Sequence, residues 1–262
     1  MPGYSYNTQG YKVLDSTILN ILQKYRNQLN FQNMGGCKIL PNYILRDYSI
    51  IVNHKKIYRI CKENGLLLPK RKKNKKRNKR ICENRKINAP KQLWQFDIKY
   101  GYVHGENKHF FLLAIIDVFS KKIINYHIGY SCKAVHLKVT FEEALLKESP
   151  DLSELVIRSD NGTQMTSNMF RKYVDEMGLE HEFTPIRCPN KNAYVESFFS
   201  IYETQFLQVR YFENFEDAFS QTVDYIDFYN NQRLHQSILK LPPSEFLEKF
   251  YQNQMPKIEV KA

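Results

Sequence analysis

The alternation of apolar and polar positions predicts three strands in the middle of the chain. Residues 93–103 alternate and are rich in aromatic and β-branched side chains, residues 110–118 are fully apolar at their core, and residues 122–130 form a third candidate. Gly105-Glu106-Asn107 and Ser120-Lys121 have the composition of turns. We therefore expect an antiparallel meander.

After the meander, helical and strand patterns alternate. We expect, in order, a helix at 134–148, a strand at 154–159, a helix through Phe170 that Gly178 ends, a strand at 180–184 and a helix from about 191. Three antiparallel strands followed by alternating helices and strands is the order of RNase H-like proteins. The predicted fold class is therefore α/β, with a mixed five-stranded sheet and helices on both faces.

The two ends of the chain show helical patterns. Residues 1–68 predict a small helical unit, with a helix at about 13–28 and another that begins after the N-cap Asn53 and ends at Asn64-Gly65. Short helices with polar breaks suit a helix-turn-helix module that binds DNA, although any small helical bundle would show this pattern. Residues 209–262 predict a C-terminal helical extension to the α/β core expected at 91–208.

The distribution of charge along the chain distinguishes one segment. The 262 residues include 39 Lys and Arg against 27 Asp and Glu, for a formal charge of +12. Nine of the basic residues fall between residues 70 and 80: Lys70, Arg71, Lys72, Lys73, Lys75, Lys76, Arg77, Lys79 and Arg80. The excess of positive charge is concentrated there, within a predicted linker at 69–90 that has too few apolar residues to bury itself. The segment is either a solvated tether or localisation signal, or an arm that grips DNA phosphates, and we favour the arm.

Other features limit the class of protein. The five cysteines show no Cys-x-x-Cys spacing and are odd in number, which favours a reducing cytoplasm over a disulfide framework. The longest apolar run, residues 110–116, is too short to span a membrane. We expect a cytoplasmic protein with no membrane partner, associated with the nucleoid.

Three acidic residues are the candidate chemistry. Asp97 lies within a predicted strand, Asp160 ends another, and Glu196 lies on a predicted helix, 35 residues after Asp160. Carboxylates in these places could hold two Mg²⁺ ions about 3.5–4 Å apart, which would activate a nucleophile and stabilise the leaving oxygen of a phosphodiester. Asp117 also ends a strand, but its neighbours resemble a turn, and we assign it a capping role.

A set of motifs resembles the DDE transposases of bacterial insertion sequences, in particular the second-frame catalytic protein of the insertion-sequence-three family, whose core is related to retroviral integrases. The motifs, in chain order, are Trp94-x-x-Asp97, Ile116-Asp117-x-Phe119-Ser120, Ser159-Asp160-Asn161-Gly162-x-Gln164, Asn192-Ala193-x-x-Glu196-Ser197-Phe198-Phe199 and Tyr229-Asn230-x-x-Arg233-x-His235. Each motif is weak alone. Together, with the 35-residue interval, they form a strong signal.

The resemblance implies metal-dependent 3′-end cleavage and strand transfer at the terminal inverted repeats of an insertion sequence. It implies Asp97, Asp160 and Glu196 as catalytic metal ligands, with two Mg²⁺ ions for which Mn²⁺ can substitute. It also implies several partners: the element ends, target DNA, an upstream-frame product or frameshift fusion, and a dimer or larger oligomer on DNA.

Further DNA contacts are expected from Asn192, Arg233 and His235, although Arg233 and His235 could equally stabilise a helix terminus. One position departs from the family pattern: Glu203 stands seven residues after Glu196, where the family usually has Lys or Arg. A carboxylate there should repel DNA, so we expect Glu203→Lys to strengthen binding. Two alternatives to a transposase remain. One is a non-catalytic DNA-binding relic or host-adopted derivative, and the other is a structure-selective nuclease on the same fold.

Overall fold

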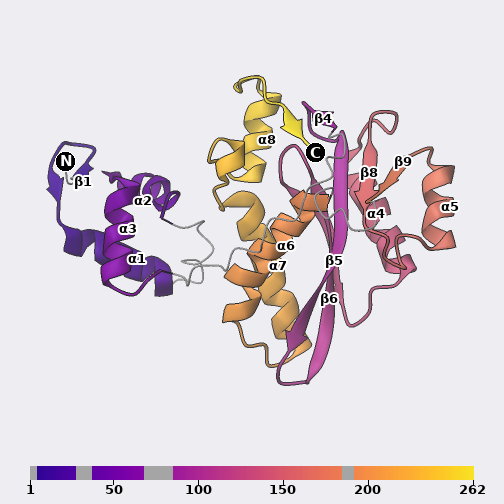
Figure 1. The fold of residues 1–262 in the computed structure, drawn as a ribbon, viewed down its shortest axis with the longest axis horizontal. Coiled ribbons are helices and arrows are strands. Elements are labelled where there is room, and N and C mark those ends of the chain that lie inside the picture. Colours follow the sequence, from indigo (N-terminus) through magenta and orange to yellow (C-terminus); the bar gives the residue numbers. More distant parts are fainter. Residues whose placement is uncertain (1–4, 28–36, 68–84, 185–191) are drawn as a thin grey trace, which may run out of the picture. The chain divides into compact units, whose positions relative to one another are not determined.

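The structure, a computed structural model, describes residues 5–27, 37–67, 85–184 and 192–262 (Figure 1). The chain divides into two compact units. The helical unit consists of Met1–Lys79 and Arg233–Leu241, and the sheet unit consists of Arg80–Gln232 and Pro242–Ala262. All nine basic residues of the predicted arm, Lys70 to Arg80, lie outside the described residues.

A mixed five-stranded sheet forms the centre of the sheet unit, in the order β7-β6-β5-β8-β9. The strands are β5 (Leu93–Val103), β6 (Lys108–Asp117), β7 (Ile123–Gly129), β8 (Val156–Ser159) and β9 (Glu180–Phe183). The first three pair antiparallel, and β5, β8 and β9 pair parallel. The predicted meander, the five-stranded mixed sheet and the RNase H-like fold class are confirmed.

Helices cover both faces of this sheet (Figure 1). On one face, α4 (Ala134–Glu148) and α5 (Asn168–Glu176) bury an apolar cluster that includes Trp94 and Phe96 of β5. On the other face, α6 (Ala193–Gln205) and α7 (Phe215–Asn231) bury a second cluster with Leu112 and Ala114 of β6. The sheet is therefore a middle layer, and residues of β5 contribute alternately to its two faces.

The remaining elements of the sheet unit are short. They are β4 (Lys86–Ile87), the 3₁₀ turn Leu207–Val209, α8 (Pro243–Tyr251) and β10 (Val260–Lys261). β10 pairs antiparallel with β4, and Phe119 packs on Phe246 and Phe250 of α8. Within the part of the chain that is described, no helix has the length and apolar character needed to cross a membrane.

The helical unit has its own core. Helices α1 (Asp15–Asn27), α2 (Leu40–Tyr48) and α3 (His54–Glu63) are joined by a small sheet of β1 (Ser5–Asn7), β2 (Lys12–Val13) and β3 (Ile50–Ile51). The predicted N-cap is confirmed, because the Asn53 side chain accepts a hydrogen bond from the Lys55 N–H, 2.8 Å away. Gly65 follows α3 with φ +64°, which suits the predicted glycine stop.

The segment Arg233–Leu241 packs with the helical unit, although it lies between α7 and α8 in the sequence. Leu234 joins the apolar cluster of α1 to α3, and its backbone N–H donates to the Tyr43 hydroxyl, 2.7 Å away. The segment includes the 3₁₀ turn Gln236–Ile238 and a β-bridge between His235 and Leu241.

Candidate active site

Strand register brings two of the predicted carboxylates to neighbouring positions. Phe96 of β5 pairs with Ser159 of the parallel strand β8, so the residues that follow them, Asp97 and Asp160, lie side by side. Asp97 is within its strand and Asp160 is just past the end of its own. Glu196 is in the first turn of α6, which packs against β5.

The ionisation of these groups reflects their proximity. Burial raises the pKa of Asp97 to about 7, and the negative charges of Asp160 and Glu196 act in the same direction. The Ile98 N–H, which donates to Asp97 Oδ1 at 2.8 Å, opposes this rise in pKa. Burial also raises the pKa of Glu196, with a further contribution from the charge of Asp160. The three carboxylates thus form one electrostatic group.

The loop after β8 holds Asp160 through its own motif residues. The Gly162 N–H donates to Asp160 Oδ1 at 2.9 Å, the Asn161 side chain donates to the Thr184 carbonyl at 2.6 Å, and the Gln164 side chain donates to the Cys132 carbonyl at 3.0 Å. A Cβ on Gly162 would lie only 3.0 Å from Asp160 Oδ1. A small residue therefore suits this position because the loop turns tightly over the carboxylate.

Two buried amides attach the start of α6 to β5. The Gln95 side chain accepts hydrogen bonds from the backbone N–H groups of Tyr194 at 3.0 Å and Val195 at 3.3 Å. Asn192 donates from Nδ2 to the Phe96 carbonyl at 3.3 Å. Both residues are almost fully buried, at 0% and 2% exposure. Gln95 is two residues before Asp97 and its partners directly precede Glu196, so these bonds fix one carboxylate relative to the other.

Sequence reasoning did not identify the role of Gln95. The available signal was a single amide within the otherwise apolar and aromatic run Leu93-Trp94-Gln95-Phe96, on the same face of the strand as Asp97. A buried polar side chain needs a hydrogen-bond partner, and here the partners are the N–H groups left free at a helix start.

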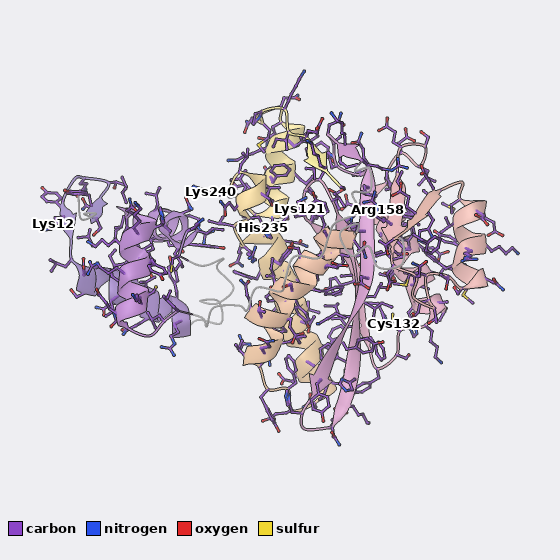
Figure 2. All side chains as sticks on the ribbon, viewed as in Figure 1. Lys12, Lys121, Cys132, Arg158, His235 and Lys240 are labelled. Carbon is purple, nitrogen blue, oxygen red and sulfur yellow. The ribbon has the colours of Figure 1, made fainter. Side chains whose placement is uncertain are left out.

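Two buried cations stabilise the surroundings of the carboxylates and are labelled in Figure 2. Arg158 of β8, at 1% exposure, contacts the Glu182 carboxylate of β9 through both Nε and Nη2 at 2.8 Å. Lys121 places its Nζ 3.5 Å from the centre of the Tyr194 ring, and burial lowers the pKa of Lys121 to about 7. These cations are engaged with neighbouring groups of the fold.

Asp117 has the capping role that its sequence context predicts. Its Oδ1 accepts from both the N–H and the hydroxyl of Ser120, at 2.7 and 2.8 Å, and its Oδ2 accepts from the Lys91 N–H at 2.7 Å. At 3% exposure it is a buried structural carboxylate.

Glu203 is paired rather than unopposed. Its Oε2 lies 2.9 Å from Nζ of Lys99, and both side chains are one-third exposed, at 33%. Lys99 follows Asp97 by two residues on β5, and Glu203 follows Glu196 by two helical turns. The positive charge beside Glu203 is therefore supplied by the neighbouring strand β5.

The predicted DNA contacts outside the basic arm are buried. Exposure is 2% for Asn192, 5% for Arg233 and 6% for His235. Asn192 holds α6 on β5, and Arg233 Nη1 lies 3.1 Å from His235 Nδ1 within the helical unit. This burial argues against direct phosphate contacts for the three side chains and favours the structural alternative for Arg233 and His235.

The donor set of the three carboxylates suits a divalent cation. Asp97, Asp160 and Glu196 supply hard oxygen atoms, and among the described residues no Lys or Arg forms an ion pair with any of them. Among the described residues, no group of three or more Asp, Glu, His or Cys side chains lies close enough together to hold one metal ion. Mg²⁺ commonly takes one or two carboxylates, with water and substrate oxygens as its other ligands, so the arrangement fits that cation.

The fold and these carboxylates define an RNase H-like integrase core, and comparison with known proteins agrees. Residues 87–189 and 177–243 each match a family described as "Integrase core domain". A chain of the simian T-cell lymphotropic virus intasome, solved in complex with PP2A regulatory subunit B56 gamma, shares the fold with a TM-score of 0.53 at 16% identity. That likeness covers 80% of this chain and 71% of the viral one.

Relatives among bacterial insertion elements narrow the assignment. The IS476 39.2 kDa protein of Xanthomonas euvesicatoria is 26% identical over 80% of this chain and 60% of its own length. The transposase for IS904 of Lactococcus lactis is 26% identical over 62% of this chain and 63% of its own length. The matches thus span less than two thirds of these relatives. Residues 87–243 therefore carry an integrase core, and the chain is similar to proteins of bacterial insertion elements.

Proposed function

We propose that this protein is a DNA transposase that cleaves the 3′ ends of an insertion sequence at its terminal inverted repeats and joins them to target DNA. The observation that carries the proposal is the electrostatic group of Asp97, Asp160 and Glu196 at the junction of β5, β8 and α6. The similarity to integrase cores and to insertion-element proteins supports the same reaction class.

The carboxylates would bind two Mg²⁺ ions, or Mn²⁺ in their place, and these ions supply charge stabilisation at the reacting phosphodiester. Asp97 would hold its oxygen ligand from a rigid strand centre. Asp160 would be oriented by the Gly162 N–H, and Glu196 by the attachment of α6 to Gln95. Deprotonated Asp97 is required for ligation, and its raised pKa makes neutral or higher pH favourable for that state.

Strand transfer distinguishes this proposal from a structure-selective nuclease on the same fold. The test incubates purified protein with labelled element ends, a target plasmid and Mg²⁺, beside Asp160→Asn. The matched control is Asp175→Asn, an exposed acidic residue on α5. Joined products that disappear in Asp160→Asn and persist in Asp175→Asn would support a transposase. Cut ends without joined products would favour the nuclease.

A non-catalytic relic or host-adopted derivative predicts another result in the same assay. Binding of the ends with neither cleavage nor joining, even when the upstream-frame product is supplied, would favour that alternative. The presence of all three carboxylates supports catalysis instead.

The proposed partners are the element ends, target DNA and further copies of the chain. Joining two ends requires at least two active sites on DNA, so we propose a dimer or larger oligomer there, assisted by an upstream-frame product or as its frameshift fusion. The helical unit and the basic arm would supply additional DNA contacts. Light scattering of the protein with and without end DNA would measure the assembly.

A further inference from the structure

The Lys99–Glu203 ion pair lies between β5 and α6, the strand and helix that carry the catalytic carboxylates Asp97 and Glu196. We call this junction of β5 and α6 the seam. Lys99 and Asp97 share one face of β5, about 6.6–6.8 Å apart along the strand. Glu203 and Glu196 share one face of α6, about 10.5 Å apart along the helix. Along the chain direction of both elements, the carboxylates Asp97 and Glu196 come first. The ion pair of Lys99 and Glu203 follows them.

The pair is accessible to a polyanion. Each side chain is 33% exposed, whereas Arg158 of the neighbouring strand is 1% exposed and enclosed by its partners. Lys99 is also close enough to Asp97 for its positive charge to lower the pKa of that carboxyl. A DNA strand that has its scissile phosphate at the carboxylates and follows β5 and α6 would bring a neighbouring phosphate within reach of the Lys99 side chain.

The pairing with Glu203 can be exchanged. An ion pair at this level of exposure contributes little to stability, because water competes for both charges. A phosphate oxygen offers the ammonium a charge-assisted hydrogen bond of the same kind, and the release of counterions from DNA favours the contact further. Glu203 has a second partner on its own side of the seam, since the Gln208 amide donates to its Oε1 at 3.4 Å. The carboxylate therefore keeps a hydrogen bond when the lysine moves.

We propose that Lys99 is a DNA-contacting residue beside the catalytic carboxylates, and that Glu203 occupies its ammonium until a DNA phosphate displaces it. The inference rests on the proposed function in taking DNA as the substrate. The cation near Glu196 is then Lys99 of β5, and Glu203 competes with the substrate phosphate for the Lys99 ammonium. The contribution of Lys99 to DNA affinity is then the difference between the free energy of its contact with a DNA phosphate and that of its ion pair with Glu203.

The experiment measures binding of the full chain to a fluorescein-labelled 20-base-pair duplex of arbitrary sequence, without metal, over a range of salt concentrations. A phosphate contact is independent of sequence, so no knowledge of the element ends is needed. Lys99→Met should weaken binding about threefold to tenfold and reduce the slope of log Kobs against log salt by about one. Lys99→Arg should retain both affinity and slope.

Glu203→Gln should act in the opposite direction and tighten binding about twofold to fivefold, because it removes the competing charge. In a Lys99→Met background this gain should be smaller. The matched control is Lys172→Met on α5, which removes an exposed lysine that also pairs with a glutamate, Glu176, at 3.6 Å. Thermal unfolding of each variant verifies that it folds.

Unchanged affinity and slope in Lys99→Met, or the same change in Lys172→Met, would overturn the proposal. Weaker binding by Glu203→Gln would also overturn it, because Glu203 would then support the contact rather than compete with it. This assay needs no catalysis. If its expected results were obtained while the joining assay showed no dependence on Asp160, the DNA contact would stand and the proposed reaction would fail.

Discussion

The two faces of β5 show how one strand can serve two purposes. The side chains of Trp94 and Phe96 point into the apolar cluster under α4 and α5, where Phe96 contacts Phe141 and Phe170. Gln95, Asp97 and Lys99 point to the other face, where each has a counterpart on α6. Trp94 and Phe96 thus pack the core on one face, and Gln95, Asp97 and Lys99 form the candidate site on the other. Mutations in alternate residues should therefore separate stability from activity.

Asp97→Asn should have the largest effect on activity and should not lower stability. Strand transfer should fall by at least ~10²–10³-fold, the loss typical of removing one preorganised electrostatic group. Because burial and two neighbouring carboxylates raise the pKa of Asp97, removing its charge relieves repulsion, and metal-free Tm at pH 7.5 should be unchanged or higher. A clear fall in Tm would contradict the division between the two faces.

Phe96→Ala should have the opposite profile. Its ring is fully buried among aromatic neighbours, so truncation should lower the free energy of unfolding by about 3–5 kcal/mol. Tyr100→Ala is the matched control, because Tyr100 lies on the same face of the same strand but is 58% exposed. Chemical denaturation should give a much smaller loss for the control, and comparable losses would show that burial does not set the effect.

Gln95→Ala should reduce both activity and stability, each by less than the substitution described above for it. It leaves the N–H groups of Tyr194 and Val195 without their acceptor, which should cost about 1–3 kcal/mol of stability. Activity should fall further than stability explains, because Glu196 would lose its fixed position relative to Asp97. Gln95→Glu keeps a side-chain acceptor and should recover part of the activity. Equal activity in Gln95→Ala and wild type, measured well below both Tm values, would exclude a positioning role.

The last prediction concerns the dependence of stability on pH. The folded pKa of Asp97, about 7, exceeds its ordinary value of 3.8, so between these values the folded state binds more protons than the unfolded state. This group therefore stabilises the fold less as pH rises from about 4 to 7. In metal-free buffer, the Tm difference between Asp97→Asn and wild type should grow in favour of the variant over that range. A difference that is constant with pH would show that Asp97 does not titrate there.

Local patterns predicted most of the sheet unit correctly. The strand at 93–103 and the helix at 134–148 have the expected bounds, because period-2 and period-3.6 patterns are visible in neighbouring residues. Asp117 was predicted as a cap because its partner, Ser120, is three residues away. These features depend on contacts between residues that are close in sequence.

The features that sequence reasoning missed depend on contacts between distant residues. Gln95 and its partner Tyr194 are 99 positions apart, and Lys99 and Glu203 lie on different elements. The sequence left two roles open for Arg233 and His235, a DNA contact or a structural role, because nothing in their neighbourhood indicates that Leu234 enters the core of the helical unit. A single sequence does not show which distant residues contact one another, so a side chain such as that of Glu203 is interpreted from its charge alone.

The parallel pairing of β5 with β8 has a consequence for how the chain folds. The meander of β5, β6 and β7 joins strands that follow one another closely, whereas Phe96 and Ser159 are 63 positions apart. Contacts between distant residues form late, because a long loop must close first. During synthesis at about 5–20 residues per second, β5 would have one unpaired edge for about 2–8 s after β6 is complete, until β8 emerges. The side-by-side arrangement of Asp97 and Asp160 therefore arises only when that edge is closed, so a nascent chain cannot assemble this pair of carboxylates before most of its sheet exists.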